Sequence, residues 1–157
     1  MGKSMKKHIH INSSLGGLET STKRVHSGKV NGKDVFTEFM VIGGVCHMIR
    51  NSTMNGIFYT AEAFDALAER LMASNERIPA PLSHPSDENG NFVSAKDPLV
   101  MSAHGVFSFD TDWAVSGDKL ISNTYIDIRR AAENEHAGWL VERLNKRQPI
   151  DRSTGLE

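Results

Sequence analysis

An α+β domain built around a mostly antiparallel β-sheet or barrel, flanked by helices, is the fold class that the sequence predicts. Its strand-like and helix-like segments follow one another in the order strands, helix, strands, helix, strand, without the regular βαβ alternation of parallel sheets. The chain has 157 residues, of which 39% are apolar, as in one domain with a buried core. We expect this domain over residues 23–157, after a flexible N-terminal arm over residues 1–22 that is rich in Ser, Gly, Thr and Lys.

The domain opens with two strand-like runs, over residues 24–30 and 34–42. Asn31-Gly32 stands between them, and because Asn-Gly favours positive φ at both turn positions, it predicts a type I′ hairpin. A further strand is expected over residues 45–49. A polar turn then leads into a short strand over residues 57–59.

An amphipathic helix is expected from Thr60, whose hydroxyl can cap it, to about Ser74. Glu62 in the first turn favours this start because the N-terminal end of a helix dipole is positive. Apolar residues recur at helical spacing and are expected to form the buried face: Phe64, Leu67, Ala68 and Leu71.

The stretch over residues 78–84 contains Pro79 and Pro81. Proline has no N–H to donate to a neighbouring strand, so this stretch is predicted to be an edge strand or an irregular extended segment. A polar loop is expected over residues 85–91, and a strand over residues 104–109.

The last part of the chain is predicted to contain a strand, a helix and an extended end. A turn over residues 110–112 is expected to lead towards the strand over residues 119–128, the clearest β pattern in the sequence. Alternate residues of that strand are expected to share one face: Leu120, Ser122, Thr124, Ile126 and Ile128. A helix over residues 129–147 is then expected to stop at Pro149, before an extended segment over residues 150–154.

Composition excludes several classes of function. The net charge of -1 gives no general electrostatic attraction to nucleic acids or acidic membranes. The chain has no apolar run long enough to span a bilayer and no signal-like segment, so a soluble protein that is not secreted is expected. The single Cys46 cannot form an internal disulfide. No phosphate-binding loop or paired-cysteine motif is present, and His8 and His10 alone are too few for a structural zinc site, so no cofactor or metal is expected.

Two residues can support covalent catalysis, His84 in Leu82-Ser83-His84-Pro85 and Ser153 near the end of the chain. A serine hydroxyl is a weak nucleophile at neutral pH and needs a neighbouring base, for which imidazole has a suitable pKa. The two residues are distant in the sequence, so only folding can bring them together. Taken alone, the pair is a weak signal, because a histidine before proline is usually a turn or packing residue and most serines have no special role.

A series of motifs spans about residues 29–157. In order, they are the run from Val45, Asn55-Gly56-Ile57-Phe58-Tyr59 with the helix after it, Leu82-Ser83-His84-Pro85, Ser94-Ala95-Lys96-Asp97-Pro98, the hairpin ending in Lys119-Leu120, the second helix, and Pro149-Ile150-Asp151-Arg152-Ser153-Thr154-Gly155. This series resembles the tailed-bacteriophage prohead proteases, which are capsid maturation serine proteases related in fold to the herpesvirus assemblins.

The resemblance implies an assemblin-like fold and a hydrolase, a serine endopeptidase in which Ser153 is the nucleophile and His84 is the base. It implies that the substrates are phage scaffold and major capsid proteins and the protease itself, with possible self-association of the chain. The expected place of action is the host bacterial cytoplasm, inside the prohead or virion. No cofactor, specific nucleic acid or membrane is expected to take part.

The resemblance leaves the third catalytic residue open. In assemblin-like enzymes a histidine or an acid orients the base, and in assemblins it follows the nucleophile in sequence. Asp97 and His104 are candidates within this chain, and a residue beyond 157 is the alternative. Because the chain ends soon after Ser153, the domain is expected to be truncated or self-processed at the C-terminus. The backbone N–H groups near Gly155 are candidates for stabilising an oxyanion.

The sequence Gly-Leu-Glu occurs twice, at residues 17–19 and 155–157. Several prohead proteases cut after glutamate and process themselves, so the resemblance suggests Glu19 and Glu157 as self-cleavage sites. Coincidence is the alternative explanation for the repeat.

A second class of function is also compatible with the sequence. The domain can be a catalytically silent structural or scaffold module of the virion that retains the protease fold. In that case the hydroxyl of Ser153 is not activated by His84, and the protein contributes only contacts to the assembling head.

Overall fold

The computed structural model describes residues 9–14, 20–54, 56–80, 87–91, 107–134, 137–146 and 151–156. Within these ranges the protein is a mixed α+β protein, and its strand pairs are antiparallel. The sheets are open, so the barrel alternative is not what the described residues form. The main sheet has five strands, in the order β2 (Thr20–Val30), β3 (Lys33–Ile49), β8 (Lys119–Asp127), β7 (Ser108–Ser116) and β6 (Ile78–Pro79).

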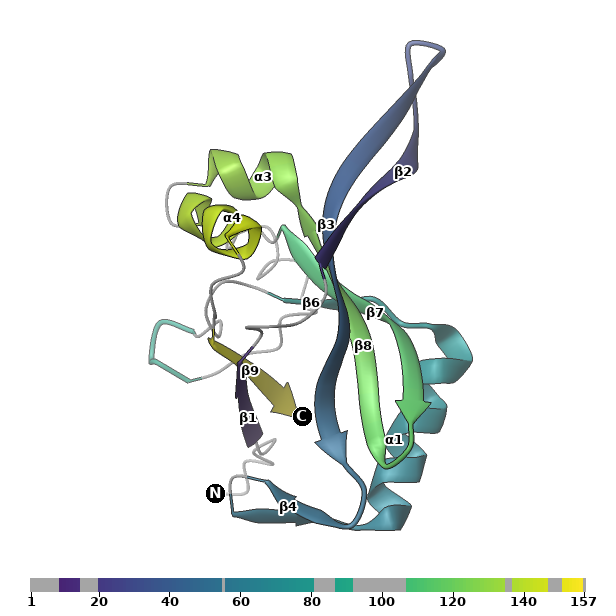
Figure 1. Ribbon diagram of the computed structural model, residues 1–157, viewed down its shortest axis with the longest axis vertical. Helices are drawn as coiled ribbons and strands as arrows, with labels where there is room; N and C mark the ends of the chain where they lie inside the picture. Colours follow the sequence, from purple (N-terminus) through teal and green to yellow (C-terminus); the bar gives the residue numbers. More distant parts are fainter. Residues whose placement is uncertain are drawn as a thin grey trace.

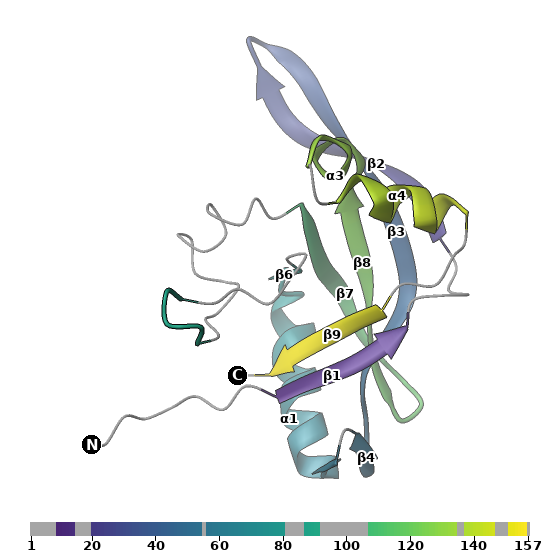
Figure 2. The same ribbon diagram turned by 90° about the vertical axis from the view of Figure 1, so that its left-hand side faces the viewer.

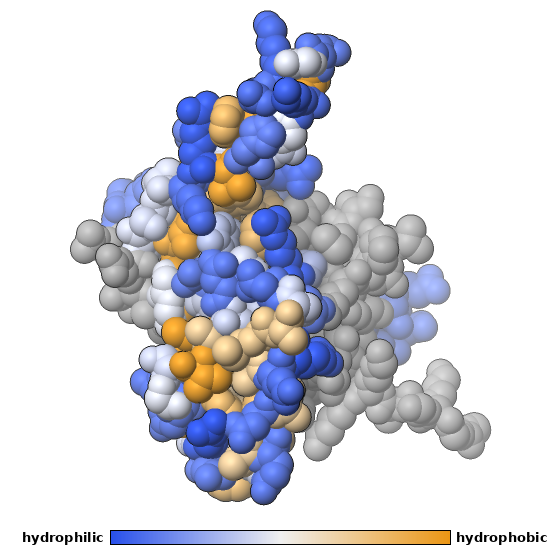
Figure 3. Space-filling model, turned by 90° about the vertical axis from the view of Figure 1, so that its right-hand side faces the viewer, coloured by the Kyte–Doolittle hydropathy of each residue, from blue (hydrophilic) through white to orange (hydrophobic). Residues whose placement is uncertain are grey.

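Strands β2 and β3 form the predicted hairpin around Asn31-Gly32. Asn31 has φ 52° and Gly32 has φ 75°, as a type I′ turn requires. The end of this hairpin projects beyond the rest of the sheet (Figure 1). Its surface is mostly hydrophilic with a few apolar side chains (Figure 3), among which Val30 is 61% exposed.

The prediction of two separate strands over residues 34–42 and 45–49 was wrong, because β3 is continuous. Its register with β8 shifts between Ile42 and Val45, and Gly44 in the shifted part has φ 67°. Glycine adopts this left-handed conformation without the steric cost of a Cβ, so the strand bulges here and does not end.

A separate two-stranded sheet joins the two ends of the described chain. Strand β1 (Ile9–Ser14) pairs with β9 (Asp151–Leu156). A flexible arm over residues 1–22 was expected, but β1 lies within that range and β2 already begins at Thr20. Ile9 and Ile11 alternate with polar residues, which suits a strand once a partner strand is available.

The predicted first helix is confirmed as α1 (Ala61–Ser74). The Thr60 hydroxyl accepts a hydrogen bond of 3.1 Å from the N–H of Ala63 and caps the helix. Three of the four residues expected on its inner face are buried and Leu67 is half-buried. Before α1, a small hairpin is formed by β4 (Ser52–Met54) and β5 (Ile57–Tyr59).

The strand β6 is the last of the main sheet, in agreement with the expected edge position of Pro79. Pro81 and the rest of the predicted extended stretch lie outside the described residues. Residues 87–91, the described part of the polar loop expected over residues 85–91, form a turn in which Asp87 N–H donates to the carbonyl of Asn91 over 2.8 Å.

The turn expected over residues 110–112 was wrong. These residues lie inside β7, and the chain turns instead at Gly117-Asp118. The register with β8 shifts between Thr111 and Ala114, and Asp112 has φ 58°. These residues therefore form a β-bulge, which accommodates one residue in a left-handed conformation without ending the strand.

Strand β8 confirms the predicted buried face as far as Asp127, with Leu120, Ser122, Thr124 and Ile126 all buried. Ile128 does not continue the strand, because the Asp127 carboxylate accepts from the N–H of Arg130 and caps a helix. The single helix expected over residues 129–147 was also wrong. It is divided into α3 (Ile128–Glu133) and α4 (Gly138–Asn145), because Asn134 turns extended after α3.

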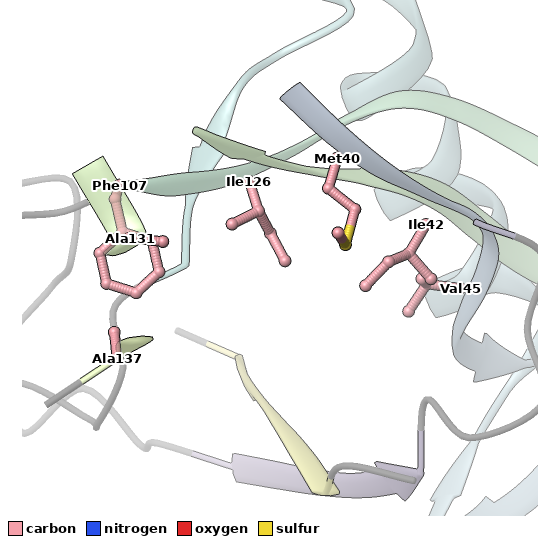
Figure 4. Close-up of a cluster of buried hydrophobic side chains, with 7 residues drawn as sticks. All are labelled: Met40, Ile42, Val45, Phe107, Ile126, Ala131 and Ala137. Carbon is pink, nitrogen blue, oxygen red and sulfur yellow. The ribbon is translucent and has the colours of Figure 1, made fainter. Parts of the chain in front are cut away.

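Two apolar clusters pack against the main sheet. Figure 2 shows β1 and β9 in front of the sheet, and Figure 1 shows α1 beside β7. In Figure 4, Met40, Ile42, Val45 and Ile126 point from the sheet towards β1 and β9. The second cluster joins α1 to the sheet and consists of Met48, Tyr59, Phe64, Ala68, Leu71 and Leu120. In the part of the chain that is described, no helix has the length and apolar character needed to cross a membrane.

Candidate functional site

Ser153, the predicted nucleophile, lies in β9, where its backbone pairs with that of Asn12 in β1. The extended conformation predicted for this segment is confirmed over residues 151–154. His84 lies outside the described residues, so the geometry between base and nucleophile is not described. The other predicted site residues outside them are Asp97, His104, Glu19 and Glu157.

A different serine and histidine are joined inside the sheet. The His47 Nε2 atom lies 2.7 Å from the hydroxyl oxygen of Ser122, and the centroids of the His47 and Trp113 rings are 5.0 Å apart. Both partners are almost fully buried, with His47 3% exposed and Ser122 1% exposed. A substrate carbonyl cannot reach a hydroxyl that is this deeply buried, so the pair is structural and satisfies two buried polar groups.

One face of the main sheet holds a cleft of about 360 Å³, which reaches Asn75 at the end of α1. Its lining includes Lys23 from β2, Phe39 from β3, Tyr125 from β8, and Phe109 and Asp112 from β7. Phe39 and Tyr125 directly precede Met40 and Ile126, which point towards β1 and β9 (Figure 4). Because side chains alternate along a strand, the cleft lies on the opposite face of the sheet from β9.

Three aromatic rings form the floor of this cleft. The Phe109 and Tyr125 rings are stacked, with centroids 5.2 Å apart and an interplanar angle of 5°. Phe39 meets them edge-on, with centroids 5.6 Å from Phe109 and 5.7 Å from Tyr125. Lys23 Nζ lies 5.7 Å from the centre of the Tyr125 ring, and the Arg77 guanidinium lies 4.7 Å from that of Phe109. Both cations are thus held by aromatic faces.

Asp112 and Tyr125 share a short hydrogen bond in the cleft, and the pKa values of both side chains are shifted. The Tyr125 hydroxyl donates to Asp112 Oδ2 over 2.5 Å, and Asn123 Nδ2 donates to the same oxygen over 3.0 Å. Burial, the hydrogen bond to Asp112 and the charge of Asp112 raise the pKa of Tyr125 to about 12. Burial alone would raise the pKa of Asp112, but hydrogen bonds from Tyr125, Asn123 and Asn75 and the charge of Lys23 lower it. At neutral pH the pair is therefore a carboxylate and a neutral phenol.

Asn75 connects α1 to this pair. It ends the helix in the left-handed conformation, with φ 44°, and its Oδ1 atom accepts a 3.0 Å hydrogen bond from the N–H of Asp112. Its carbonyl also accepts a 3.2 Å bond from the Thr111 hydroxyl. Asn75 and Asp112, both with positive φ, are thus hydrogen-bonded side by side, and this contact joins the end of α1 to the bulge in β7.

The sequence interpretation missed the cleft. Two signals were present: an asparagine directly after a helix, which is a common left-handed cap, and an aspartate in a run that alternates like a strand. Among the described residues, no group of three or more His, Cys, Asp or Glu side chains is arranged to hold a metal ion.

Comparison with known proteins adds no identification. No protein-family model matches the chain, and neither the curated proteins nor the solved structures include a match to it.

Proposed function

We propose that the chain is a serine endopeptidase of the phage prohead class, in which Ser153 is the nucleophile and His84 is the base. The observation that carries the proposal is the ordered series of motifs that ends in Arg152-Ser153-Thr154-Gly155. The extended conformation of β9 supports it, because one edge of β9 pairs with β1 and the other has no strand partner among the described residues. A substrate can pair its backbone with such an edge as an added strand.

The proposed chemistry is acyl transfer. The Ser153 oxygen attacks the scissile carbonyl carbon while His84 accepts the hydroxyl proton. The tetrahedral intermediate collapses to an acyl-enzyme, and His84 returns the proton to the departing amine. Water, with His84 again as base, then releases the acid product. Backbone N–H groups near Gly155 are the proposed donors to the oxyanion.

The proposed substrates are scaffold and major capsid proteins inside an assembling head within the host bacterium. Enclosure with its substrates gives the protease a high effective concentration, so a modest affinity for each cleavage site suffices. Self-cleavage after Glu19 and Glu157 belongs to the same proposal. Mass spectrometry of protein made from the full gene tests it, because new termini at Thr20 and at Glu157 are expected only if the chain cuts there.

Labelling with a fluorophosphonate, followed by peptide mapping, tests the nucleophile. The reagent modifies only a serine activated by a base, so label is expected on Ser153 and is expected to disappear in both Ser153→Ala and His84→Ala. Ser116→Ala, an exposed serine at the end of β7, is the matched control and should label as the parent does.

Ser153→Ala removes one hydroxyl and should also abolish processing while the protein stays folded. Retained cleavage in that variant would refute the assignment. A folded protein with no label and no cleavage would favour the alternative, a catalytically silent structural or scaffold module of the virion. Label on Ser122 would show that the buried pair with His47 becomes accessible and is the reactive one.

A further inference from the structure

The cleft lined by β2, β3, β7 and β8 has an excess of positive charge. Lys23, Arg24 and Arg77 line it, against a single carboxylate, Asp112. The ion pairs formed between described residues use none of these three cations. His26, also in the lining, is already paired with Asp34 over 3.0 Å.

Asp112 does not neutralise this charge fully. Its Oδ2 atom already accepts hydrogen bonds from Tyr125 and Asn123. Its carboxylate is therefore fixed within the wall of the cleft. Lys23 interacts with it electrostatically, yet Arg24 and Arg77 remain as charges without a carboxylate partner among the described residues.

Arg77 is positioned for a planar anion. Its guanidinium carbon lies 4.7 Å from the centre of the Phe109 ring, and the N–H donors of a guanidinium lie in one plane. These donors match the two oxygens of a carboxylate, so a ligand can be bound at two points. Lys23 over the Tyr125 ring supplies a second charge across the same aromatic floor.

We propose that this cleft binds the acidic side chains of an extended peptide segment from a partner protein. Its volume of about 360 Å³ is at the small end of ligand sites and suits one or two side chains. A single-stranded nucleic acid fits less well, because base stacking needs open ring faces. Here Phe109 and Tyr125 stack on each other, and Arg77 and Lys23 lie over them.

The site is separate from the proposed protease centre. It lies on the opposite face of the main sheet from β9, which carries Ser153. The inference therefore does not rest on the proposed function, and binding is expected to be the same in Ser153→Ala as in the parent chain.

Calorimetric titration of the whole chain at low salt tests the proposal. The probe is a blocked hexapeptide of alternating Ala and Glu, and the control peptide has Gln in place of Glu. The Glu peptide is expected to bind one to one and the Gln peptide at least about tenfold more weakly, since charge-assisted hydrogen bonds are lost. Arg77→Ala should weaken Glu-peptide binding about tenfold, and Lys23→Ala should also weaken it.

Matched variants keep the result interpretable. Arg70→Ala removes an exposed arginine of α1 that does not line the cleft, and Lys29→Ala removes an exposed lysine of β2, so both should bind as the parent does. Arg77→Lys keeps the charge but not the planar fork and should fall between the parent and Arg77→Ala. Unchanged thermal unfolding of these variants shows that binding, not folding, has changed.

Three outcomes would overturn the proposal. The first is equal binding of the Glu and Gln peptides, and the second is equal weakening by Arg77→Ala and Arg70→Ala. The third is tighter binding of an oligothymidylate or of inorganic phosphate than of the Glu peptide, which would assign the cleft to a nucleic acid or to a small oxyanion.

Discussion

Replacing Tyr125 by Phe removes one hydroxyl and, with it, the hydrogen bond to Asp112. The bond is short, 2.5 Å, and its acceptor is charged at neutral pH. Hydrogen bonds to charged groups contribute about 1.5–3 kcal/mol to stability. Asp112 is exposed at the surface and keeps its bond from Asn123, so water and this second donor replace part of the loss. We therefore expect Tyr125→Phe to lower the free energy of unfolding by about 1–2 kcal/mol at neutral pH.

The pH dependence of this difference follows from the two pKa shifts. The folded-state pKa of Asp112 is lowered, so its contribution is present above the unfolded pKa of about 4 and is lost as the pH falls through the folded value. The folded-state pKa of Tyr125 is raised to about 12, so its contribution is lost as the pH rises from about 10 through 12. The advantage of the parent over Tyr125→Phe should be constant between these two windows and shrink in both.

Urea unfolding, followed by circular dichroism at a series of pH values, measures the difference. Tyr59→Phe is the matched control, because the buried Tyr59 hydroxyl has no hydrogen-bond partner among the described residues and its removal should be neutral or slightly stabilising. A double-mutant cycle of Tyr125→Phe with Asp112→Asn isolates the coupling of the pair, and asparagine tolerates the positive φ at this position. Equal effects of Tyr125→Phe and Tyr59→Phe, or no change with pH, would refute the assignment of charge and proton to this pair.

Two further predictions concern residues that organise the cleft and the core. Asn75→Ala should destabilise the protein by about 2 kcal/mol, because it removes the acceptor for the Asp112 N–H and puts alanine at a positive φ that asparagine tolerates better. Asn75→Gly should cost about half as much, because only the acceptor is lost. Equal losses of the two variants in urea unfolding would contradict the contribution of the positive φ. Ser122→Ala should lower the free energy of unfolding by about 1–2 kcal/mol, because the buried His47 ring loses a hydrogen-bond partner. Fluorophosphonate labelling should stay unchanged in this variant. Loss of label in a folded Ser122→Ala protein would instead implicate the buried pair in catalysis.

Elements whose signals are local were predicted well. The Asn31-Gly32 turn needs only its own two residues to adopt positive φ, and Thr60 caps α1 through a hydroxyl that is three residues from its donor. The buried face of β8 followed from strict alternation over residues 120–126. In each case the physical cause lies within a few residues of the element.

Elements that depend on distant partners were predicted poorly. Residues Ile9–Ser14 form a strand because β9, from the other end of the chain, pairs with them. No local sequence pattern predicts which segment this partner is. Asp110–Asp112 have the composition of a turn, but pairing with β8 keeps them in a strand. The predicted His84–Ser153 pair depends on the same kind of long-range juxtaposition, and it stays a prediction because His84 lies outside the described residues.

The two β-bulges and the left-handed cap of α1, which the local sequence pattern did not predict, also organise the cleft. Asn123 of β8 accepts a 3.3 Å hydrogen bond from the N–H of Gly44 in one bulge and donates to Asp112 in the other. The bulge at Asp112 brings its carboxylate to the Tyr125 hydroxyl, and the left-handed cap at Asn75 fixes the N–H of Asp112. Asn75, Asp112 and Asn123 therefore set the geometry of the cleft through contacts between elements that are distant in the sequence, which no local pattern predicts.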